Sequence, residues 1–332
     1  MIKIIAELGQ AHEGSLGIAH SYIDALSKTG VDAIKFQTHI AEAESSEFEK
    51  FRINFSYEDT TRYEYWKRME FTLEQWAGLK NHCNDLGLEF ISSPFSCAAV
   101  DLLEKINVNT YKIGSGEVEN KLMIDKIAKT GKQIYLSSGM STFLEIENTI
   151  NWIKKFNNNI SIFQCTSSYP ILPEEWGLNI INEMKKKYIY PIGFSDHSGD
   201  IFASLSATLL GVELLEFHAV FHKEIFGPDT KASLTLDQIS LLTKGVRQIE
   251  IAKKNDVHKE NIEKFVDMKI IFGKSLCVNK KLSQGHTLTI DDLDAKKPAK
   301  CGISAAEYDK IIGKKLKQDL NKWDFLNDNL IH

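Results

Sequence analysis

The stretch KIIAELGQAHEGSLGIAHSYIDALSKTGVDAIKFQ, residues 3–37, contains the unit that decides the fold. It begins and ends with short apolar runs, over residues 3–7 and 33–37, which predict buried strands. Between them, Ile18, Tyr22 and Leu26 recur at helical spacing, so that one side of a helix would cover the strands. The stretch therefore predicts a strand, a helix and a second strand in succession.

The same alternation continues along most of the chain. Strand-like runs separated by segments of helical spacing occupy residues 3–7, 33–37, 88–93, 110–114, 133–137, 160–164, 190–194 and 213–218. Eight strands alternating with helices over roughly 250 residues is the size of a (β/α)8 barrel, whereas an open doubly wound sheet more often has about five or six strands. We therefore predict an α/β fold whose main part is a (β/α)8 TIM barrel.

The composition changes after the barrel pattern ends. We place the barrel catalytic domain at residues 1–255, a charged linker at 256–274 and a small β-rich domain at 275–332. Turn signals such as Gln284-Gly285 and Cys301-Gly302 are frequent in this last segment. About sixty residues of this kind have marginal stability alone and would gain stability by docking, which predicts a homodimer.

Composition also narrows the possible classes of function. The 332 residues carry 40 Lys and Arg against 45 Asp and Glu, a formal net charge of −5, so no basic excess is available for nucleic acid. The five cysteines include no CxxC pair, which argues against a disulfide framework and favours a reducing compartment. Residues 1–9 lack a signal-peptide core, and the most apolar long segment, 201–215, is interrupted by polar residues. We expect a cytoplasmic protein that does not bind membranes.

Polar side chains gather where the predicted strands end, which is the edge of the barrel at which such enzymes hold their chemistry. Lys35 and Lys112 each end an apolar strand, where a buried ammonium group is costly unless an anion neutralises it. They predict an anionic ligand, the alternative being structural salt bridges with barrel carboxylates. Hydroxyl groups suited to a phosphate follow the same strands, at Ser93, Ser115, Ser137 and Ser195.

His197 and His218 end neighbouring strands, so their imidazoles would meet and, with substrate oxygens, form an open site for a divalent ion. Either histidine taken singly would more often be structural. Glu13 follows the first strand and is either a group that acts on a proton or water, or an acid at the start of a helix. Residues 40–71, rich in Glu and aromatic side chains, predict a lid or substrate loop.

A series of short motifs follows along the chain: AELGQAHEGS, DAIKFQTH, ISSPFS, YKIGSGE, LSSGMS, CTSSYP, GFSDHS, EFH and GPDTKASL. Their order and spacing resemble those of the sialic acid (N-acetylneuraminate) synthase family, which includes the legionaminic, pseudaminic and other nonulosonic acid synthases. The resemblance covers nearly the full chain, and its C-terminal segment resembles the family's antifreeze-like (SAF) domain. It implies a homodimer in which the antifreeze-like domain of one chain caps the barrel of the other.

The resemblance also implies a reaction and roles for individual residues. Phosphoenolpyruvate would condense with an N-acetylmannosamine-like aldehyde sugar, with the help of Mn²⁺, Mg²⁺ or another divalent ion, to give a 3-deoxy-2-keto sugar acid and phosphate. The implied ligands are Lys35, Ser93, Lys112, Ser115, Ser137, Ser167 and Ser195 for phosphoenolpyruvate, His197 and His218 for the metal, and Gln37, Tyr169, Asp229 and Lys297 for the sugar. The implied catalytic residues are Glu13, Lys35, Lys112 and Asp229, with Glu13 the candidate for orienting or deprotonating water.

Three positions depart from the family pattern. Ser167 replaces the usual Asn, and EFHAVF changes the surroundings of His218. Lys297-Pro298-Ala299 replaces Arg-Pro-Gly, and lysine lacks the bidentate guanidinium fork. The acceptor therefore need not be N-acetylmannosamine. Three alternatives stay open: a synthase of a related keto-deoxy sugar acid with a non-N-acetylated acceptor, a Schiff-base pyruvate aldolase, and a non-catalytic sugar binder.

Overall fold

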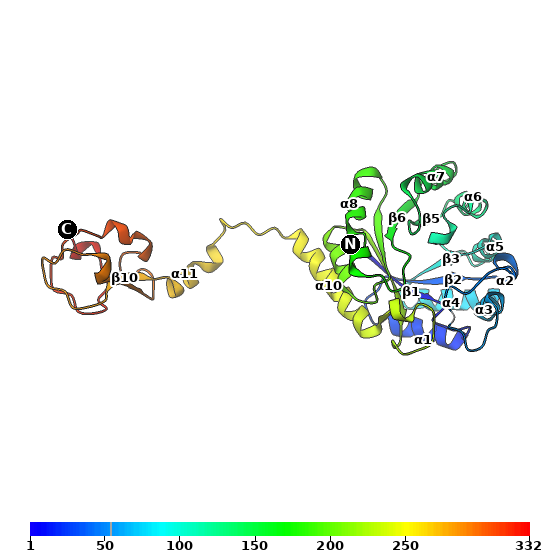
Figure 1. Ribbon diagram of the computed structural model, residues 1–332, viewed down its shortest axis with the longest axis horizontal. Helices are drawn as coiled ribbons and strands as arrows, with labels where there is room; N and C mark the ends of the chain where they lie inside the picture. Colours follow the sequence, from blue (N-terminus) through cyan, green and yellow to red (C-terminus); the bar gives the residue numbers. More distant parts are fainter. Residues whose placement is uncertain (54) are drawn as a thin grey trace. The chain divides into compact units, whose positions relative to one another are not determined.

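The computed structural model describes residues 1–53 and 55–332, which form two compact units, Met1–Lys254 and Asn255–His332. In the first unit, parallel strands pair in sequence order and the last pairs with the first, so the sheet closes into a barrel (Figure 1). The barrel strands are β1 (Lys3–Gly9), β2 (Ala33–Thr38), β3 (Glu89–Pro94), β4 (Thr110–Ile113), β5 (Gln133–Ser137), β6 (Ile160–Cys165), β7 (Ile192–Asp196) and β8 (Leu214–Val220). The predicted eight-stranded barrel is confirmed, with strand limits within about two residues of those expected.

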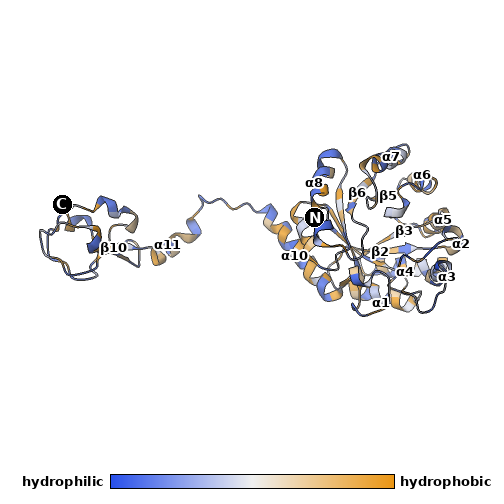
Figure 2. Cartoon of the chain, viewed as in Figure 1, coloured by the Kyte–Doolittle hydropathy of each residue, from blue (hydrophilic) through white to orange (hydrophobic). Residues whose placement is uncertain are grey.

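Helices surround the barrel and connect its strands (Figure 1). They are α1 (Leu16–Leu26), α2 (Ala41–Glu44), α3 (Arg62–Met69), α4 (Leu73–Asp85), α5 (Cys97–Lys105), α6 (Lys121–Lys129), α7 (Phe143–Ile153), α8 (Leu178–Lys187), α9 (Phe202–Leu209) and α10 (Leu236–Lys254). Short 3-10 helices at Ser115–Glu117, Pro173–Glu175 and Thr230–Ala232, and the two-residue strand β9 (Leu234–Thr235), complete the unit. Hydrophobic and hydrophilic residues alternate around these helices, as α10 shows in Figure 2. No described helix is long and apolar enough to span a membrane.

Strand residues alternate between the two faces of the barrel wall, because successive side chains in a strand point to opposite sides. In β1, Ile4, Ala6 and Leu8 are buried in the large core between the strands and the helices. Ile5 belongs instead to a separate cluster, which it forms with Ala33, Ile91, Tyr135, Phe163 and Leu214. These six side chains come from different barrel strands and fill the interior of the barrel.

The interior cluster supports the polar layer above it. Two residues beyond each of its members, toward the carboxyl end of the strand and on the same face, lie Glu7, Lys35, Ser93, Ser137, Cys165 and Glu216. The same alternation that packs the barrel therefore turns a set of polar and charged side chains inward.

The second unit has its own elements and its own apolar core. Its elements are α11 (Val266–Phe272), the antiparallel strands β10 (Ser275–Val278) and β11 (Leu293–Lys296), and 3-10 helices at Glu263–Phe265, Ile290–Asp292, Ala305–Lys310 and Asp328–Leu330. Its core contains Leu276, Val278, Leu282, Leu288, Ile303, Ile311, Leu316, Leu320, Leu326 and Ile331. The segment expected as a linker, 256–274, includes the 3-10 helix at Glu263–Phe265 and α11, and it is grouped with this unit.

The barrel interior at Gly193 gives a test of the packing. A Cβ atom there would lie 2.7 Å from two ring carbons of Phe163, and a buried ring has little room to move. We expect Gly193→Ala to reduce the free energy of unfolding by about 1–3 kcal/mol in urea titrations, because the interior would be overpacked. The matched control is Gly78→Ala in α4, where an added Cβ meets no atom within 4 Å. It should be neutral or stabilising by up to about 1 kcal/mol, and equal losses in both variants would contradict this packing.

Candidate active site

The carboxyl ends of the barrel strands surround a cavity of about 310 Å³. Twelve of the side chains singled out from the sequence line it: Lys35, Gln37, Ser93, Lys112, Ser115, Ser137, Ser167, Tyr169, Ser195, His197, His218 and Asp229. Glu13 and Lys297 are not among the lining residues. The barrel therefore brings most of the predicted site together in one place.

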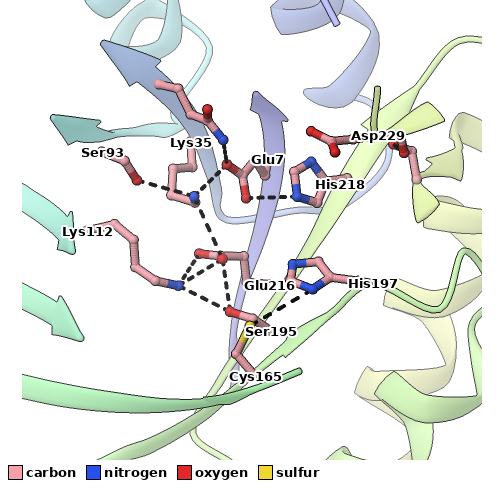
Figure 3. A network of polar contacts seen from close by, with 12 residues as sticks. Glu7, Lys35, Ser93, Lys112, Cys165, Ser195, His197, Glu216, His218 and Asp229 are labelled. Atoms are coloured by element: carbon pink, nitrogen blue, oxygen red, sulfur yellow. Dashed lines mark hydrogen bonds and ion pairs between the residues drawn. The ribbon is translucent and has the colours of Figure 1, made fainter. Parts of the chain in front are cut away.

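Two buried ion pairs form the floor of this cavity (Figure 3). Lys35 Nζ lies 2.7 Å from Glu7 Oε1 and 3.7 Å from Glu216 Oε1. Lys112 Nζ lies 2.8 Å and 2.9 Å from the two carboxylate oxygens of Glu216. All four side chains are at most 4% exposed. Both lysines thus pair with barrel carboxylates, which is the alternative that the sequence left open. This pairing keeps two cations inside the cavity.

The ion pairs shift the protonation equilibria of their members. Burial alone would raise the pKa of Glu216, but Lys112 and Lys35 outweigh it and hold that pKa below its usual range. Burial would also raise the pKa of Glu7, but His218 and Lys35 outweigh it and lower that pKa. For Lys35, the carboxylates outweigh burial and raise the pKa, whereas burial lowers the pKa of Lys112. Both carboxylates are therefore ionised near neutral pH.

Neighbouring polar side chains fix the orientation of these charges. Ser195 Oγ lies 3.1 Å from Lys112 Nζ and donates to Glu216 Oε1 at 2.9 Å, while Ser93 Oγ lies 3.4 Å from Lys35 Nζ. Gln37 Nε2 donates to Glu7 Oε1 at 2.7 Å. The charged floor is therefore held by hydrogen bonds as well as by ion pairs.

Three serine hydroxyls converge beside the floor around a glycine. Ser115 Oγ donates to Ser137 Oγ at 3.1 Å, and Ser167 Oγ is buried without a hydrogen-bond partner among the described residues. A Cβ atom at Gly139 would lie 2.3 Å from Ser167 Oγ and 2.4 Å from Ser115 Oγ, so a side chain at this position would displace both hydroxyls. Hydroxyls that converge in this way, one of them unsatisfied, suit the oxygens of a phosphate group.

The two predicted histidines meet at the same end of the barrel. The ring centres of His197 and His218 are 5.4 Å apart, and Tyr169 stacks on His197 with ring centres 4.1 Å apart. Burial lowers the pKa of His218. Burial acts in the same direction on His197, but Cys165 and the Thr166 carbonyl outweigh it and raise the pKa to about 9.

The chemistry of this imidazole pair fits a divalent ion. His197 Nδ1 lies 2.9 Å from the carbonyl oxygen of Thr166 and donates to it, which leaves Nε2 to bind an ion in exchange for its proton. In residues 1–53 and 55–332 there is no group of three or more His, Cys, Asp or Glu side chains suited to a metal. An ion on these two histidines would therefore complete its coordination with oxygens from substrate or water.

The segment predicted as a lid or substrate loop, residues 40–71, borders the cavity through Arg52, Arg62 and Trp66. Arg52 Nη2 lies 2.9 Å from Asp229 Oδ1 in the loop after β8, and its guanidinium lies 4.3 Å from the ring centre of Tyr169. These contacts connect the segment to two residues expected to bind the sugar.

Glu13 lies in the loop after β1, where Arg68 Nη1 binds its carbonyl oxygen at 3.1 Å and its Oε2 at 3.0 Å. Burial raises the pKa of Glu13 to about 7, although Arg68 lowers it. Glu13, which we expected to act on water, therefore lies outside the lining of the cavity. Lys297 belongs to the second unit, where its Nζ lies 4.9 Å from the ring centre of Phe272.

Glu7 ends the first predicted strand and is expected at the same rim, but the sequence reasoning gave neither Glu7 nor Glu216 a role in the site. Both belong to quoted motifs, and each lies two residues from an inward-facing apolar residue of its strand, Ile5 or Leu214. The period of two in strands β1 and β8 would have placed them inside the barrel beside the lysines. Arg52 and Arg62 were also missed, because the 40–71 segment was interpreted from its acidic and aromatic residues.

Comparison with known proteins gives consistent results. A family model described as the NeuB family matches residues 22–258. The N,N'-diacetyllegionaminic acid synthase of Campylobacter jejuni is 32% identical over 317 residues, covering 94% of each chain. Human N-acetylneuraminate-9-phosphate synthase is 30% identical over 334 residues, covering 99% of this chain and 92% of the relative. A crystal structure of the sialic acid synthetase of Leptospira borgpetersenii superposes with a TM-score of 0.71 at 27% identity, covering 81% of this chain and 91% of the other.

Glu216 provides a stability test of the charged floor. At neutral pH we expect Glu216→Gln to cost about 3–5 kcal/mol of unfolding free energy in urea titrations, because Lys112 loses its partner inside the barrel. The pKa of Glu216 is lowered from 4.5 in the folded protein. Its contribution to the free energy of unfolding is therefore present above pH 4.5 and is lost as the pH falls below that value. Below pH 4.5, wild-type stability should therefore fall more steeply than that of the variant.

The control is Glu147→Gln, which removes the carboxylate of a pair with Lys187 whose side chains are 41% and 42% exposed. It should cost less than about 1 kcal/mol. A similar loss in both variants, or parallel acid profiles for the wild type and Glu216→Gln, would show that the buried pairing does not stabilise the protein as described.

Proposed function

Because the chain belongs to the NeuB family, we propose that it condenses phosphoenolpyruvate with an aldehyde amino sugar. The products are inorganic phosphate and a nonulosonic acid, that is, a 3-deoxy-2-keto sugar acid of the sialic acid type. Relatives named as legionaminic, neuraminic and pseudaminic acid synthases support this class of product. The observation that carries the proposal is that two buried lysines, the three converging serine hydroxyls and two imidazoles line one cavity.

In this proposal, phosphoenolpyruvate binds at the inner end of the cavity. The hydroxyls of Ser115, Ser137 and Ser167 hold its phosphate, and the buried ammonium groups of Lys35 and Lys112 donate hydrogen bonds to its oxygens. The lysines are held in place by their carboxylate partners before the substrate arrives, so little reorganisation is needed on binding. The same groups then stabilise the phosphate as it leaves.

The aldehyde of the acceptor lies beside His197 and His218. A Mn²⁺ or similar ion held by these imidazoles would polarise the aldehyde oxygen and make its carbon a better electrophile. Tyr169 stacks on His197 and forms a wall for the sugar, while Gln37 and Asp229 offer hydrogen-bonding groups to its hydroxyls. This arrangement holds the aldehyde carbon near the substrate carbon that attacks it.

Carbon–carbon bond formation leaves positive charge on C2 of the former phosphoenolpyruvate, and water adds there before phosphate departs. Glu7 and Glu216 place negative charge next to this centre. Glu13 retains its proposed role toward the water only if it leaves Arg68 and approaches the cavity, because Arg68 binds it through two contacts. Lys112 Nζ contacts both carboxylate oxygens of Glu216, so the amine that a Schiff base would require is already engaged, which favours this reaction over Schiff-base chemistry.

The predicted site can be tested by measuring phosphate release. We expect release to require phosphoenolpyruvate, an aldehyde amino sugar and Mn²⁺ together, and to fall at least about 100-fold in Lys112→Ala and His197→Ala. His258→Ala, at an exposed position of the second unit, is the matched control. Unchanged rates in the first two variants would show that the site is wrongly assigned. Trapping of a pyruvate adduct by borohydride would support the aldolase, and sugar binding without turnover of any aldehyde would support the non-catalytic binder.

We further propose that the second unit is an antifreeze-like (SAF) domain and that the protein is a cytoplasmic, domain-swapped homodimer. The small apolar core of this unit is the supporting observation, because few buried side chains give little stability alone. In the dimer, Lys297 of one chain would reach the acceptor in the barrel of the other. We expect light scattering to report a dimer, and a fully active monomer would contradict this proposal.

A further inference from the structure

A buried histidine beside the cavity has no part in the proposed condensation. His39 follows β2, two residues after Gln37, and its side chain is 1% exposed. It does not line the cavity, but two aromatic side chains that stack on its ring do. The ring centre of His39 lies 3.8 Å from that of Trp66 and 4.6 Å from that of Phe95. His39 therefore supports the wall of the cavity without being part of it.

Both ring nitrogens of His39 face acceptor oxygens. Nδ1 lies 2.7 Å from Oε1 of Glu44 in α2, and Nε2 lies 3.2 Å from Oε1 of Gln37. The side chain of Glu44 is itself only 7% exposed, and its other carboxylate oxygen accepts from the backbone N–H of Ile40 at 3.3 Å. Because the ring is stacked on aromatic neighbours and hydrogen-bonded through both nitrogens, it has little freedom to rotate.

This network fixes the orientation of the Gln37 amide. Its Nε2 donates to Oε1 of Glu7 at 2.7 Å, and its Oε1 accepts from Nε2 of Gln10 and from Nε2 of His39. Glu7 is a carboxylate paired with Lys35, so it can only accept. A half-turn of the amide would place its oxygen against this carboxylate and its N–H groups against the two donors. Only one orientation therefore satisfies all of these neighbours.

The orientation of Gln37 determines what it can offer to a ligand. Its oxygen already accepts from two donors, and one hydrogen of its Nε2 is on Glu7, so the other N–H is the group left for a substrate. Gln37 lines the cavity and is the residue to which the proposed function assigns a contact with the sugar. A side chain that is fixed beforehand loses less freedom on binding than one that must first be ordered.

We propose that His39, held by Glu44, is a positioning residue that fixes the Gln37 amide so that its remaining N–H group donates to an oxygen of the acceptor sugar. The inference rests on the proposed function, because it concerns how the same site holds the acceptor. Glu44 and Trp66 both belong to residues 40–71. This segment therefore orients a sugar-binding side chain from behind the wall, in addition to bordering the cavity.

The test uses two substitutions that separate the hydrogen bonds of His39 from its packing. His39→Phe keeps an aromatic ring beside Trp66 and Phe95 but has no donor, whereas His39→Gln keeps an N–H donor and loses the ring. With N-acetylmannosamine, phosphoenolpyruvate and Mn²⁺, we expect the Phe variant to raise KM for the sugar at least about fivefold. KM for phosphoenolpyruvate should change less than about twofold, because Glu7 keeps its pairing with Lys35. The Gln variant should stay closer to the wild type, and a role in packing alone predicts the reverse order.

Two further variants control for the fold. His39→Phe alone would leave the buried carboxylate of Glu44 unpaired, so it is combined with Glu44→Leu, which removes both partners together. His20→Phe makes the same chemical change outside the cavity lining, where Nδ1 of His20 lies 2.8 Å from Nδ1 of His82 and the ring centres are 4.9 Å apart. This control should leave both KM values within about twofold of the wild type.

A second background shows whether His39 acts through Gln37. In Gln37→Ala, adding His39→Phe with Glu44→Leu should change KM for the sugar less than about twofold, because the amide to be positioned is gone. An equal rise in KM with and without Gln37, or an unchanged KM in the Phe variant, would overturn the inference and leave the condensation in place. If the wild type does not consume the sugar, the condensation fails for this acceptor, and a crystal structure of the combined Phe and Leu variant decides the inference. A Gln37 side chain turned away from Glu7 would support it, and an unmoved one would refute it.

Discussion

The active site depends on the pairing of two buried lysines with two buried glutamates inside the barrel. An isolated ammonium group at 2–4% exposure would lose its proton or destabilise the fold, and a carboxylate would face the same penalty. Because Lys35 and Lys112 share Glu7 and Glu216, all four groups stay in place and the charges compensate one another. This floor gives the cavity two fixed cations to offer to an anionic substrate.

The barrel makes this pairing geometrically possible. The strands that carry Glu7 and Glu216 pair at the seam that closes the sheet, and Glu7 pairs in register with Lys35 on its other side. The apolar interior cluster lies two residues before Glu7, Lys35 and Glu216 along their strands and supports these side chains from beneath. The serine hydroxyls and the imidazole pair line the same cavity as the floor, so the proposed substrate binding and aldehyde activation would take place in one place. Residues 40–71 add arginines to the outer part.

Much of this arrangement could be predicted from the sequence, because alternating apolar residues report which face of a strand is buried. The barrel and the convergence of Lys35, Lys112, His197 and His218 followed from residues at strand ends. The partners of the lysines were harder to identify, since the period of two places Glu7 and Glu216 inside the barrel but does not tell which cation each will meet. Glu13 was expected in the site, but Arg68 binds it outside the cavity lining. This contact joins two segments that are distant in the sequence, and no local pattern could have predicted it.

The most direct test of the central claim is a crystal structure of the protein with phosphoenolpyruvate and Mn²⁺. We expect the phosphate among the hydroxyls of Ser115, Ser137 and Ser167, with the ammonium groups of both buried lysines turned to the ligand and the ion on the two imidazoles. A well-occupied phosphoenolpyruvate bound elsewhere, with the lysines still paired only to their glutamates, would contradict it.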